Sequence, residues 1–358
     1  MIKVYQKYLA KSFLKMLLIV FAIFFSLVII LNVFEEVSYL KDTDTNLFFP
    51  FLLTLLNSPS IVFETFPFIF FIATQFLFIR FLDREELEIF KKVSLTNSKI
   101  IFILSLTSLF ISIFLIVFYY NLSSNLKFIY LELKNEYSKD NKYLAVVTEN
   151  GLWIKDEINN NINIINASKI DEDKLIDVTI NQFNKQYENI NNIIAKEINI
   201  KNKLWIVQRG TFSRNNNSQV KENIIFETNF NSRQIKQMFS DLTSLNFFAL
   251  KKLRDDYKSL GYSTTNVSIH LHKLLSYPLN LTIMTIFGSI IMLNIKRNKS
   301  KIFHIILGTL FSVMIYYMNY FSSLFGENEK VPIVISIWLP LIIISLFCTI
   351  GLVRINEK

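Results

Sequence analysis

The densest group of ionisable residues in this sequence lies between two long apolar stretches. Residues 83–88 read Asp-Arg-Glu-Glu-Leu-Glu, and Lys91-Lys92 follow one turn later. Leu87 and Phe90 are three positions apart, which is the spacing of one face of a helix. Carboxylates at the start of a helix and bases at its end both suit the helix dipole. The run therefore predicts a short amphipathic helix near residues 83–95.

Two functions fit this predicted helix. One is a solvated helix at a membrane surface, where its charges face only water. The other is a docking helix that packs against a cytoplasmic partner. In that case Ile89 and Val93 extend its apolar face, less regularly, and one carboxylate pairs with an Arg or Lys of the partner. The residue pattern alone fits both functions.

The sequence lacks the signatures of catalysis and of metal binding. None of the seven glycines is followed by lysine, so the phosphate-binding loop of P-loop ATPases is absent. His270 and His272 have a spacing that can suit a metal, but they directly precede an apolar span, where interfacial polar residues are expected. The single cysteine, Cys348, excludes an internal disulfide and a cysteine-based zinc site. We therefore expect this chain to bind no metal or cofactor and to carry no catalytic residue.

The composition indicates a membrane protein. Hydrophobic residues make up 51% of the 358 residues, charged residues only 19%, and the mean hydropathy is +0.35. A soluble domain cannot bury so much apolar surface and still cover itself with polar groups. Six segments are long and apolar enough to span a bilayer. They are Met16–Phe34, Ser60–Ile79, Ile100–Leu122, Leu274–Ile295, Ile302–Leu324 and Ile333–Val353.

Two further features concern the spans. The stretch Leu47–Leu56 is too short to cross a bilayer and ends before Ser58-Pro59, so we expect a separate helix at the outer interface. Glu64 is the only charged residue inside a predicted span. Secondary carriers need polar groups or broken helices near the membrane midplane, so the scarcity of such groups argues against a carrier.

Lysines and arginines beside the spans predict the orientation. The flanks on the side of the two termini hold fifteen basic residues against five acidic ones. The opposite short loops hold two basic residues against six acidic ones. By the positive-inside rule, both termini are cytoplasmic. The net charge of +9 is thus a signal of topology, and no nucleic-acid partner is expected.

Residues 123–273, between the third and fourth spans, have a different pattern. Short runs of alternating apolar and polar residues are typical of β-strands. These runs begin at Leu144, Leu152, Ile162, Leu175, Ile198, Leu204 and Ile224. They predict an antiparallel sandwich or jelly roll with Trp153 and Trp205 as core anchors, followed by a return helix over Ser232–Leu260. The predicted fold class is an α+β membrane protein, with three spans in residues 1–122, this inserted domain, and three spans in residues 274–358.

Several motifs also follow one another in a characteristic order. They are Leu56–Pro67 with its two prolines, Phe81–Thr96, Gly151-Leu-Trp-Ile-Lys-Asp, Lys203-Leu-Trp, His272–Leu279, Val331-Pro and Trp338-Leu-Pro. In this order and spacing the chain resembles the LptF/LptG lipopolysaccharide export permease family over essentially its whole length. The Gly-Leu-Trp strand and the last span look more like LptG than LptF.

The resemblance implies a permease subunit of an ABC transporter in the bacterial inner membrane. Such a subunit extracts lipopolysaccharide, and its inserted domain is a periplasmic β-jelly roll. The implied partners are an LptB-like ATPase dimer that uses the ATP, a paralogous six-span subunit, LptC-like and LptA-like jelly-roll proteins, and lipopolysaccharide itself. Glu86 would enter a groove of the ATPase and meet a basic residue there, with Arg84, Leu87 and Phe90 as further coupling residues.

Two departures from the family pattern stand out. Ser94 replaces the glycine of the family's loop, and Lys91-Lys92 replace the small residues before it. Relatives often carry lysines at the outer end of the first span, where they suit lipid A phosphates, whereas this end reads Asn32-Val-Phe-Glu-Glu. Asn32 and Lys41 are therefore the candidate residues for contact with the substrate.

Three alternatives to this function remain. The chain could be a permease subunit that exports another lipid or a lipoprotein. It could be a membrane-anchored periplasmic binding or sensor protein, although its cytoplasmic loops are too short for a signalling domain. The β-domain could also brace the complex without carrying lipid. The identity of the partner proteins distinguishes the first two alternatives from the predicted transporter.

Overall fold

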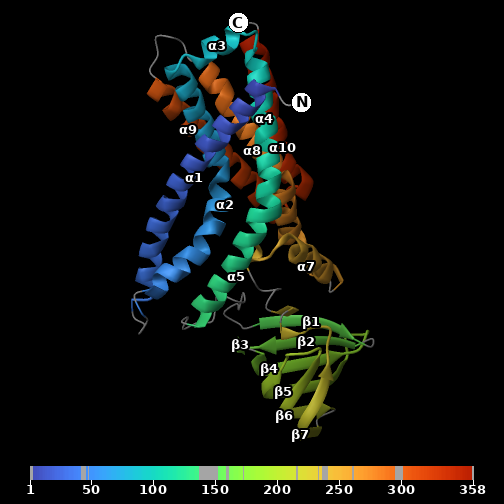
Figure 1. The fold of residues 1–358 in the computed structure, drawn as a ribbon. Coiled ribbons are helices and arrows are strands. Elements are labelled where there is room, and N and C mark those ends of the chain that lie inside the picture. Colours follow the sequence, from blue (N-terminus) through green and yellow to red (C-terminus); the bar gives the residue numbers. More distant parts are fainter. Residues whose placement is uncertain are drawn as a thin grey trace. The chain divides into compact units, whose positions relative to one another are not determined.

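The computed structural model describes residues 3–41, 46, 48–136, 152–158, 161–171, 173–214, 217–232, 234–235, 241–259, 262–294 and 301–356. The chain divides into two compact units. One combines Met1–Lys127 with Thr265–Lys358, and the other is Phe128–Thr264. The first is a helical bundle, and the second is built on an antiparallel sheet (Figure 1).

In the described part of the chain, six helices are long and apolar enough to cross a membrane, which confirms the predicted number of spans. They are α1 (Val4–Tyr39), α2 (Phe48–Asp83), the run of α4 (Asn97–Phe114), π-helical η1 (Leu115–Tyr120) and α5 (Asn121–Glu136), then α8 (Thr265–Leu293), α9 (Lys301–Glu327) and α10 (Ile333–Asn356). A seventh, short helix, α3 (Glu86–Lys92), lies at the end of the bundle where α1 begins and α10 ends (Figure 1).

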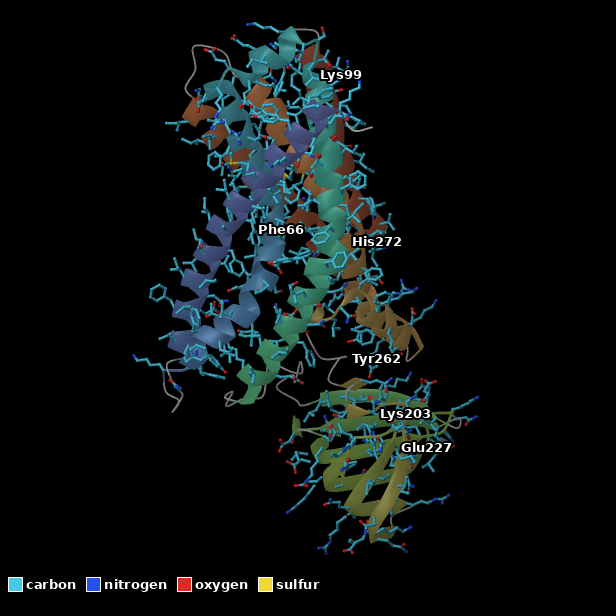
Figure 2. The ribbon with its side chains drawn as sticks, viewed as in Figure 1. Phe66, Lys99, Lys203, Glu227, Tyr262 and His272 are labelled. Atoms are coloured by element: carbon cyan, nitrogen blue, oxygen red, sulfur yellow. The ribbon has the colours of Figure 1, made fainter. Side chains whose placement is uncertain are left out.

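The core of the bundle is built around α2. Two thirds of its most apolar window, 67%, is buried, against 22% for α1 and for α9. Its interior face carries fully buried aromatic rings, including Phe66, Phe70 and Phe71 (Figure 2). A helix that is apolar on all sides, as α2 is, packs against several neighbours or against lipid. Thus α2 is central, and α1 and α9 are peripheral.

The apolar stretch before Pro59 is not a separate interfacial helix, contrary to the expectation for Leu47–Leu56. From Phe48 onward this stretch forms the first turns of α2, which continues through Pro59 and Pro67 to Asp83. Proline inside a helix is tolerated in a membrane when neighbouring helices satisfy the backbone groups that it leaves. Pro59 leaves the carbonyl of Leu55 without its helical donor, and a separate contact, from the hydroxyl of Tyr119 to the carbonyl of Pro59 itself at 3.1 Å, joins η1 to α2 here.

At Pro67 and at Pro340, a neighbouring helix supplies a donor for the carbonyl that the proline leaves without one. Pro67 has no N–H, so the carbonyl of Phe63, four residues earlier, loses its helical donor. The hydroxyl of Tyr277 on α8 donates to that carbonyl instead. Pro340 likewise leaves the carbonyl of Ser336 without its helical donor. This carbonyl accepts a hydrogen bond from the hydroxyl of Ser322 on α9 at 2.6 Å. Side chains of adjacent helices thus stabilise both interrupted helices.

An antiparallel sheet of seven strands is inserted between the third and fourth spans, as predicted. Its strands are β1 (Leu152–Ile158), β2 (Asn161–Ala167), β3 (Lys169–Asp171), β4 (Lys174–Phe183), β5 (Asn189–Asn199), β6 (Leu204–Arg214) and β7 (Asn217–Glu227). Their order is β1-β2-β4-β5-β6-β7, with the short β3 paired to β4, so each pair of neighbours is consecutive in sequence except β2 and β4. The run predicted at Leu144 lies outside the described residues.

The sheet buries one face, and the two tryptophans lie on opposite faces. On β1, Leu152 and Ile154 are buried, whereas Trp153 between them is 51% exposed. Trp205 on β6 is fully buried, and its ring lies 6.1 Å from that of Phe226 on β7. The core position predicted for Trp205 is therefore correct, and that for Trp153 is wrong. Period-two alternation identifies two faces but not which of them is covered.

A buried carboxylate joins the two edges of the sheet. Asp156 on β1 is fully buried and accepts hydrogen bonds from Asn229, just after β7: from its backbone N–H at 3.2 Å and its side-chain amide at 2.8 Å. The next residue, Phe230, accepts a hydrogen bond from the indole N–H of Trp205 at 2.9 Å. The chain leaving β7 therefore crosses back to β1 and covers the buried face.

The return segment over Ser232–Leu260 is helical in parts and is not one continuous helix. Among its described residues, Ser232, Gln234 and Ile235 are helical, and a short 3-10 turn, η2 (Leu242–Ser244), and the helix α7 (Phe247–Ser259) follow. Asn246 caps α7 by accepting a hydrogen bond from the backbone N–H of Ala249 at 2.9 Å. The segment Thr228–Asn231 before them instead packs on the sheet.

Candidate functional site

The charged run forms the helix α3, which spans only two turns and begins and ends in unusual backbone conformations. Glu85, before its first residue, has φ 55°, and Ser94, just beyond its end, has φ 58°. Both values lie in the left-handed region that favours glycine. Arg84 and Glu85 form the turn from the last residue of α2, Asp83, into α3. Lys99, in the first turn of α4, lies at the same end of the bundle (Figure 2).

The four predicted coupling residues differ in their exposure. Arg84 is exposed, Glu86 and Leu87 are half-buried, and Phe90 is only 8% exposed. The ring of Phe90 meets that of Phe81 on α2 edge-on, with centroids 5.6 Å apart. Phe90 therefore anchors α3 to its own helical bundle.

The apolar residues predicted to share one face of α3 lie on two faces. Ile89 and Val93, four positions apart, are 54% and 66% exposed, while Phe90 points inward. The exposed pair, together with Arg84 and Glu88, gives α3 an outer surface that is partly apolar and partly charged. Such a surface suits a partner protein better than it suits water alone.

Two contacts tie α3 and the end of α2 to peripheral helices. The hydroxyl of Tyr8 on α1 donates a hydrogen bond to Oε2 of Glu86 at 2.8 Å, and its ring lies edge-on to Phe90 at 6.3 Å. Lys301, the first residue of α9, forms an ion pair with Asp83. Sequence reasoning missed both contacts because the partners lie 78 and 218 residues apart. A local sequence pattern cannot indicate a contact between residues that lie so far apart in the chain.

Ser94 lies in a left-handed conformation, which gives a physical reason for the glycine that the family resemblance implies at this position. The N–H of Ser94 donates to the carbonyl of Lys91 at 3.0 Å, and that of Leu95 donates to the carbonyl of Phe90 at 2.9 Å. These bonds close the end of α3 in the manner of a glycine cap. A serine Cβ in this conformation costs about 1 kcal/mol relative to glycine.

Replacing Ser94 by glycine should therefore stabilise the end of α3 by about 1 kcal/mol. Amide hydrogen exchange at Leu95 should slow by about fivefold, because that amide closes the cap. Ser94→Ala is the matched control, since it removes the hydroxyl but keeps the Cβ, and it should give no gain. Equal protection in both variants would show that backbone strain does not govern this end of the helix.

The two predicted substrate-contact residues lie far from α3, at the opposite end of α1. Asn32 is only 3% exposed, and neither atom of its amide has a hydrogen-bond partner among the described residues. Glu36, one turn further along α1, is fully buried. Lys41 follows the end of α1 and is exposed. Asn32 therefore packs inside this unit, and of the two only Lys41 faces outward.

The two histidines singled out for their spacing have separate partners. Nε2 of His270 lies 3.0 Å from the hydroxyl of Tyr120. Nδ1 of His272, on α8 (Figure 2), lies 3.3 Å from the indole nitrogen of Trp338 on α10. Within the described part of the chain, no group of three or more histidine, cysteine, aspartate or glutamate residues could hold a metal ion. The histidines link helices at this end of the bundle.

The arrangement of the chain has a counterpart among known families. The sequence pattern of the family described as lipopolysaccharide export system permease LptF/LptG matches residues 7–354. A comparison with curated proteins gives no match. Six membrane-spanning helices with an inserted antiparallel sheet agree with the architecture expected from the resemblance. Because the match covers nearly all of its 358 residues, this chain belongs to the LptF/LptG family of lipopolysaccharide export permeases.

Proposed function

We propose that this chain is the LptG-type transmembrane subunit of an ABC transporter that extracts lipopolysaccharide from the inner membrane. The transporter passes the lipid to a periplasmic β-jelly-roll bridge towards the outer membrane. The observation that carries this proposal is the helix α3 in a chain of this permease family. It offers the half-buried Glu86, with which no base pairs among the described residues, beside the exposed Ile89 and Val93.

In the proposed mechanism, an LptB-like ATPase dimer binds this end of the bundle and supplies all of the ATP hydrolysis. Glu86 meets a basic residue in a groove of the ATPase, because a partly desolvated carboxylate gains most from a charged partner. Arg84 and Leu87 contribute the adjoining contacts. Phe90 has an indirect role and does not contact the ATPase, since its packing on Phe81 fixes the position of α3 on the bundle.

The proposed orientation puts both termini and α3 in the cytoplasm and the sheet in the periplasm. It is supported by the fifteen basic residues in the flanks on the side of the termini. It is also supported by the grouping of α3, the start of α1 and the end of α10 at one end of the bundle (Figure 1).

For the lipid, we propose a path along the peripheral spans α1 and α9, which would form the lateral gate with a paralogous six-span subunit. A shallow apolar groove of about 500 Å³ runs along α1 and is lined by Ala22, Ile23, Ser26, Leu27, Ile30 and Leu31. Such a surface suits acyl chains, and it also suits a second apolar subunit. Lys41, just beyond α1, is the base available to a lipid phosphate at that end.

The β-domain is proposed to receive the lipid and to hand it to LptC-like and LptA-like jelly-roll proteins. The end strand β7 of the open sheet can add a strand from a partner, whereas backbone groups of β1 at Lys155 and Glu157 already bond Tyr262 and Asn229. A cavity of about 270 Å³ on the sheet has apolar walls, including Ile193, Phe212 and Ile224, crossed by a row of amides from Asn163, Gln182 and Asn191. This mixture of groups suits a lipid with polar substituents.

The test of this function is affinity purification of the tagged full-length chain in mild detergent, with mass spectrometry of proteins and lipids. We expect a P-loop ATPase, a second six-span subunit and bound lipopolysaccharide. Recovery of the ATPase with a different lipid or a lipoprotein would instead support a permease for another cargo. Recovery of the chain alone, or as a homodimer without ATPase, would refute the transporter function.

A further inference from the structure

We propose that Tyr8 is a positioning residue that links the coupling carboxylate Glu86 to α1, so that a displacement of α3 moves the first span. The proposal rests on the proposed function, because it assigns a route by which the ATPase acts on the membrane helices. It concerns a side chain that lies outside α3, near the start of α1.

One tyrosine holds α3 at two points. Its hydroxyl donates to Oε2 of Glu86 at 2.8 Å, and its ring meets the ring of Phe90 edge-on at 6.3 Å. Glu86 and Phe90 are four residues apart, so they lie one above the other on the same side of the helix. Tyr8 therefore contacts both turns of α3, with its hydroxyl at one turn and its ring at the next.

The hydrogen bond from Tyr8 leaves Glu86 able to bind a second group. An ionised carboxylate accepts about four hydrogen bonds through its two oxygens. Tyr8 occupies one position on Oε2, and among the described residues no lysine or arginine pairs with this carboxylate. Glu86 can therefore accept from Tyr8 and from a basic residue of the ATPase at the same time. In that state a single carboxylate connects the ATPase to α1.

The link between Tyr8 and Glu86 matters because α1 is a peripheral helix of the bundle. Only 22% of its most apolar window is buried, and α1 packs in the bundle chiefly against α2. α9 is equally peripheral, and it is tied to the last residue of α2 through the ion pair of Lys301 with Asp83. A push on α3 therefore reaches α1 directly through Tyr8, whereas it reaches α9 only through the end of α2.

The test compares Tyr8→Phe with Tyr5→Phe in the reconstituted full complex. Tyr8→Phe removes only the hydroxyl and keeps the ring on Phe90. Tyr5 lies three residues earlier on α1, and its hydroxyl has no hydrogen bond among the described residues, so Tyr5→Phe is the matched control. For Tyr8→Phe we expect lipid released per ATP hydrolysed to fall by about tenfold, as suits the loss of a hydrogen bond to a charged group. Tyr5→Phe should match the wild type.

A second readout separates positioning from a structural role. Spin labels placed at the exposed Leu18 on α1 and at Ile343 on α10, with Cys348 replaced by alanine, report the distance between these helices. In the wild type and in Tyr5→Phe, nucleotide should shift this distance, and in Tyr8→Phe the shift should be lost. A Tyr8→Phe complex that behaves like Tyr5→Phe, or keeps the shift, overturns the proposal. So does a Tyr8→Phe chain that no longer assembles with the ATPase, since Tyr8 would then be a folding residue.

A third measurement keeps this proposal distinguishable from the function on which it rests. In the purified chain without ATPase, amide exchange over residues 86–92 should be faster in Tyr8→Phe than in Tyr5→Phe, because α3 has lost its link to α1. If the wild-type complex releases no lipid, the proposed function fails. Equal exchange in the two variants would refute the link between Tyr8 and Glu86 whatever the function is.

Discussion

Replacing Glu86 by lysine should abolish recovery of the ATPase with the tagged chain. The substitution reverses the charge that faces the basic residue of the partner, and it leaves two positive groups together at a partly desolvated contact. Truncating one member of such a pair typically costs about 2–5 kcal/mol, or about 30-fold to several thousand-fold in affinity. Charge reversal should reach the upper end of that range. The measurement is the amount of ATPase that co-purifies with each variant in mild detergent.

Glu88→Lys is the matched control for this experiment. The substitution at Glu88 makes the same charge change on the same short helix. The side chain of Glu88 is exposed, whereas that of Glu86 is half-buried and accepts a hydrogen bond from the hydroxyl of Tyr8. Exposed ion pairs contribute only about 0–1 kcal/mol, so Glu88→Lys should keep most of the ATPase. If both variants lose the partner, net charge governs docking. If both keep it, the ATPase binds elsewhere.

The contrast between the two glutamates shows what the sequence could and could not predict about α3. The acidic start and basic end indicate a helix, and the apolar spacing indicates an amphipathic one. Within two turns, however, the period of 3.6 residues cannot decide between a face containing Phe90 and one containing Ile89 and Val93. The choice depends on Phe81 and Tyr8, which belong to other helices. Only the packing of α1 and α2 at this end of the bundle determines which apolar residues stay exposed.

The spans themselves were predictable because length and apolar content decide whether a helix crosses a bilayer. The continuation of α2 through its two prolines was missed, since part of it depends on a partner outside α2. The hydroxyl of Tyr277 supplies the donor that the carbonyl of Phe63 loses at Pro67, and Tyr277 is distant in sequence. A local rule that ends a helix at proline fails where other helices supply the missing donors.

Replacing Trp205 by alanine should destabilise the β-domain by about 3–5 kcal/mol, the usual cost of removing a large buried aromatic side chain. Trp205 is fully buried, it packs on Phe226 of the neighbouring strand, and its indole N–H satisfies the carbonyl of Phe230. The substitution leaves a cavity in the core and an unpaired carbonyl. Amide exchange over β6 and β7 in the full-length chain should accelerate by more than a hundredfold.

Trp153→Ala and Trp205→Phe separate the contribution of burial from that of the indole hydrogen bond in the destabilisation by Trp205→Ala. Trp153 is 51% exposed on the other face of the sheet, so its removal should cost less than about 1 kcal/mol. Trp205→Phe keeps an aromatic ring in the core but leaves the carbonyl of Phe230 unpaired, which should cost about 1–3 kcal/mol. If Trp153→Ala instead proves as costly as Trp205→Ala, the face of the sheet that carries Trp153 must be covered in the assembled protein. The buried core described for β1 and β6 would then be only one of two packed faces, as in a sandwich, because two tryptophans on opposite faces can both be costly only when both faces are packed.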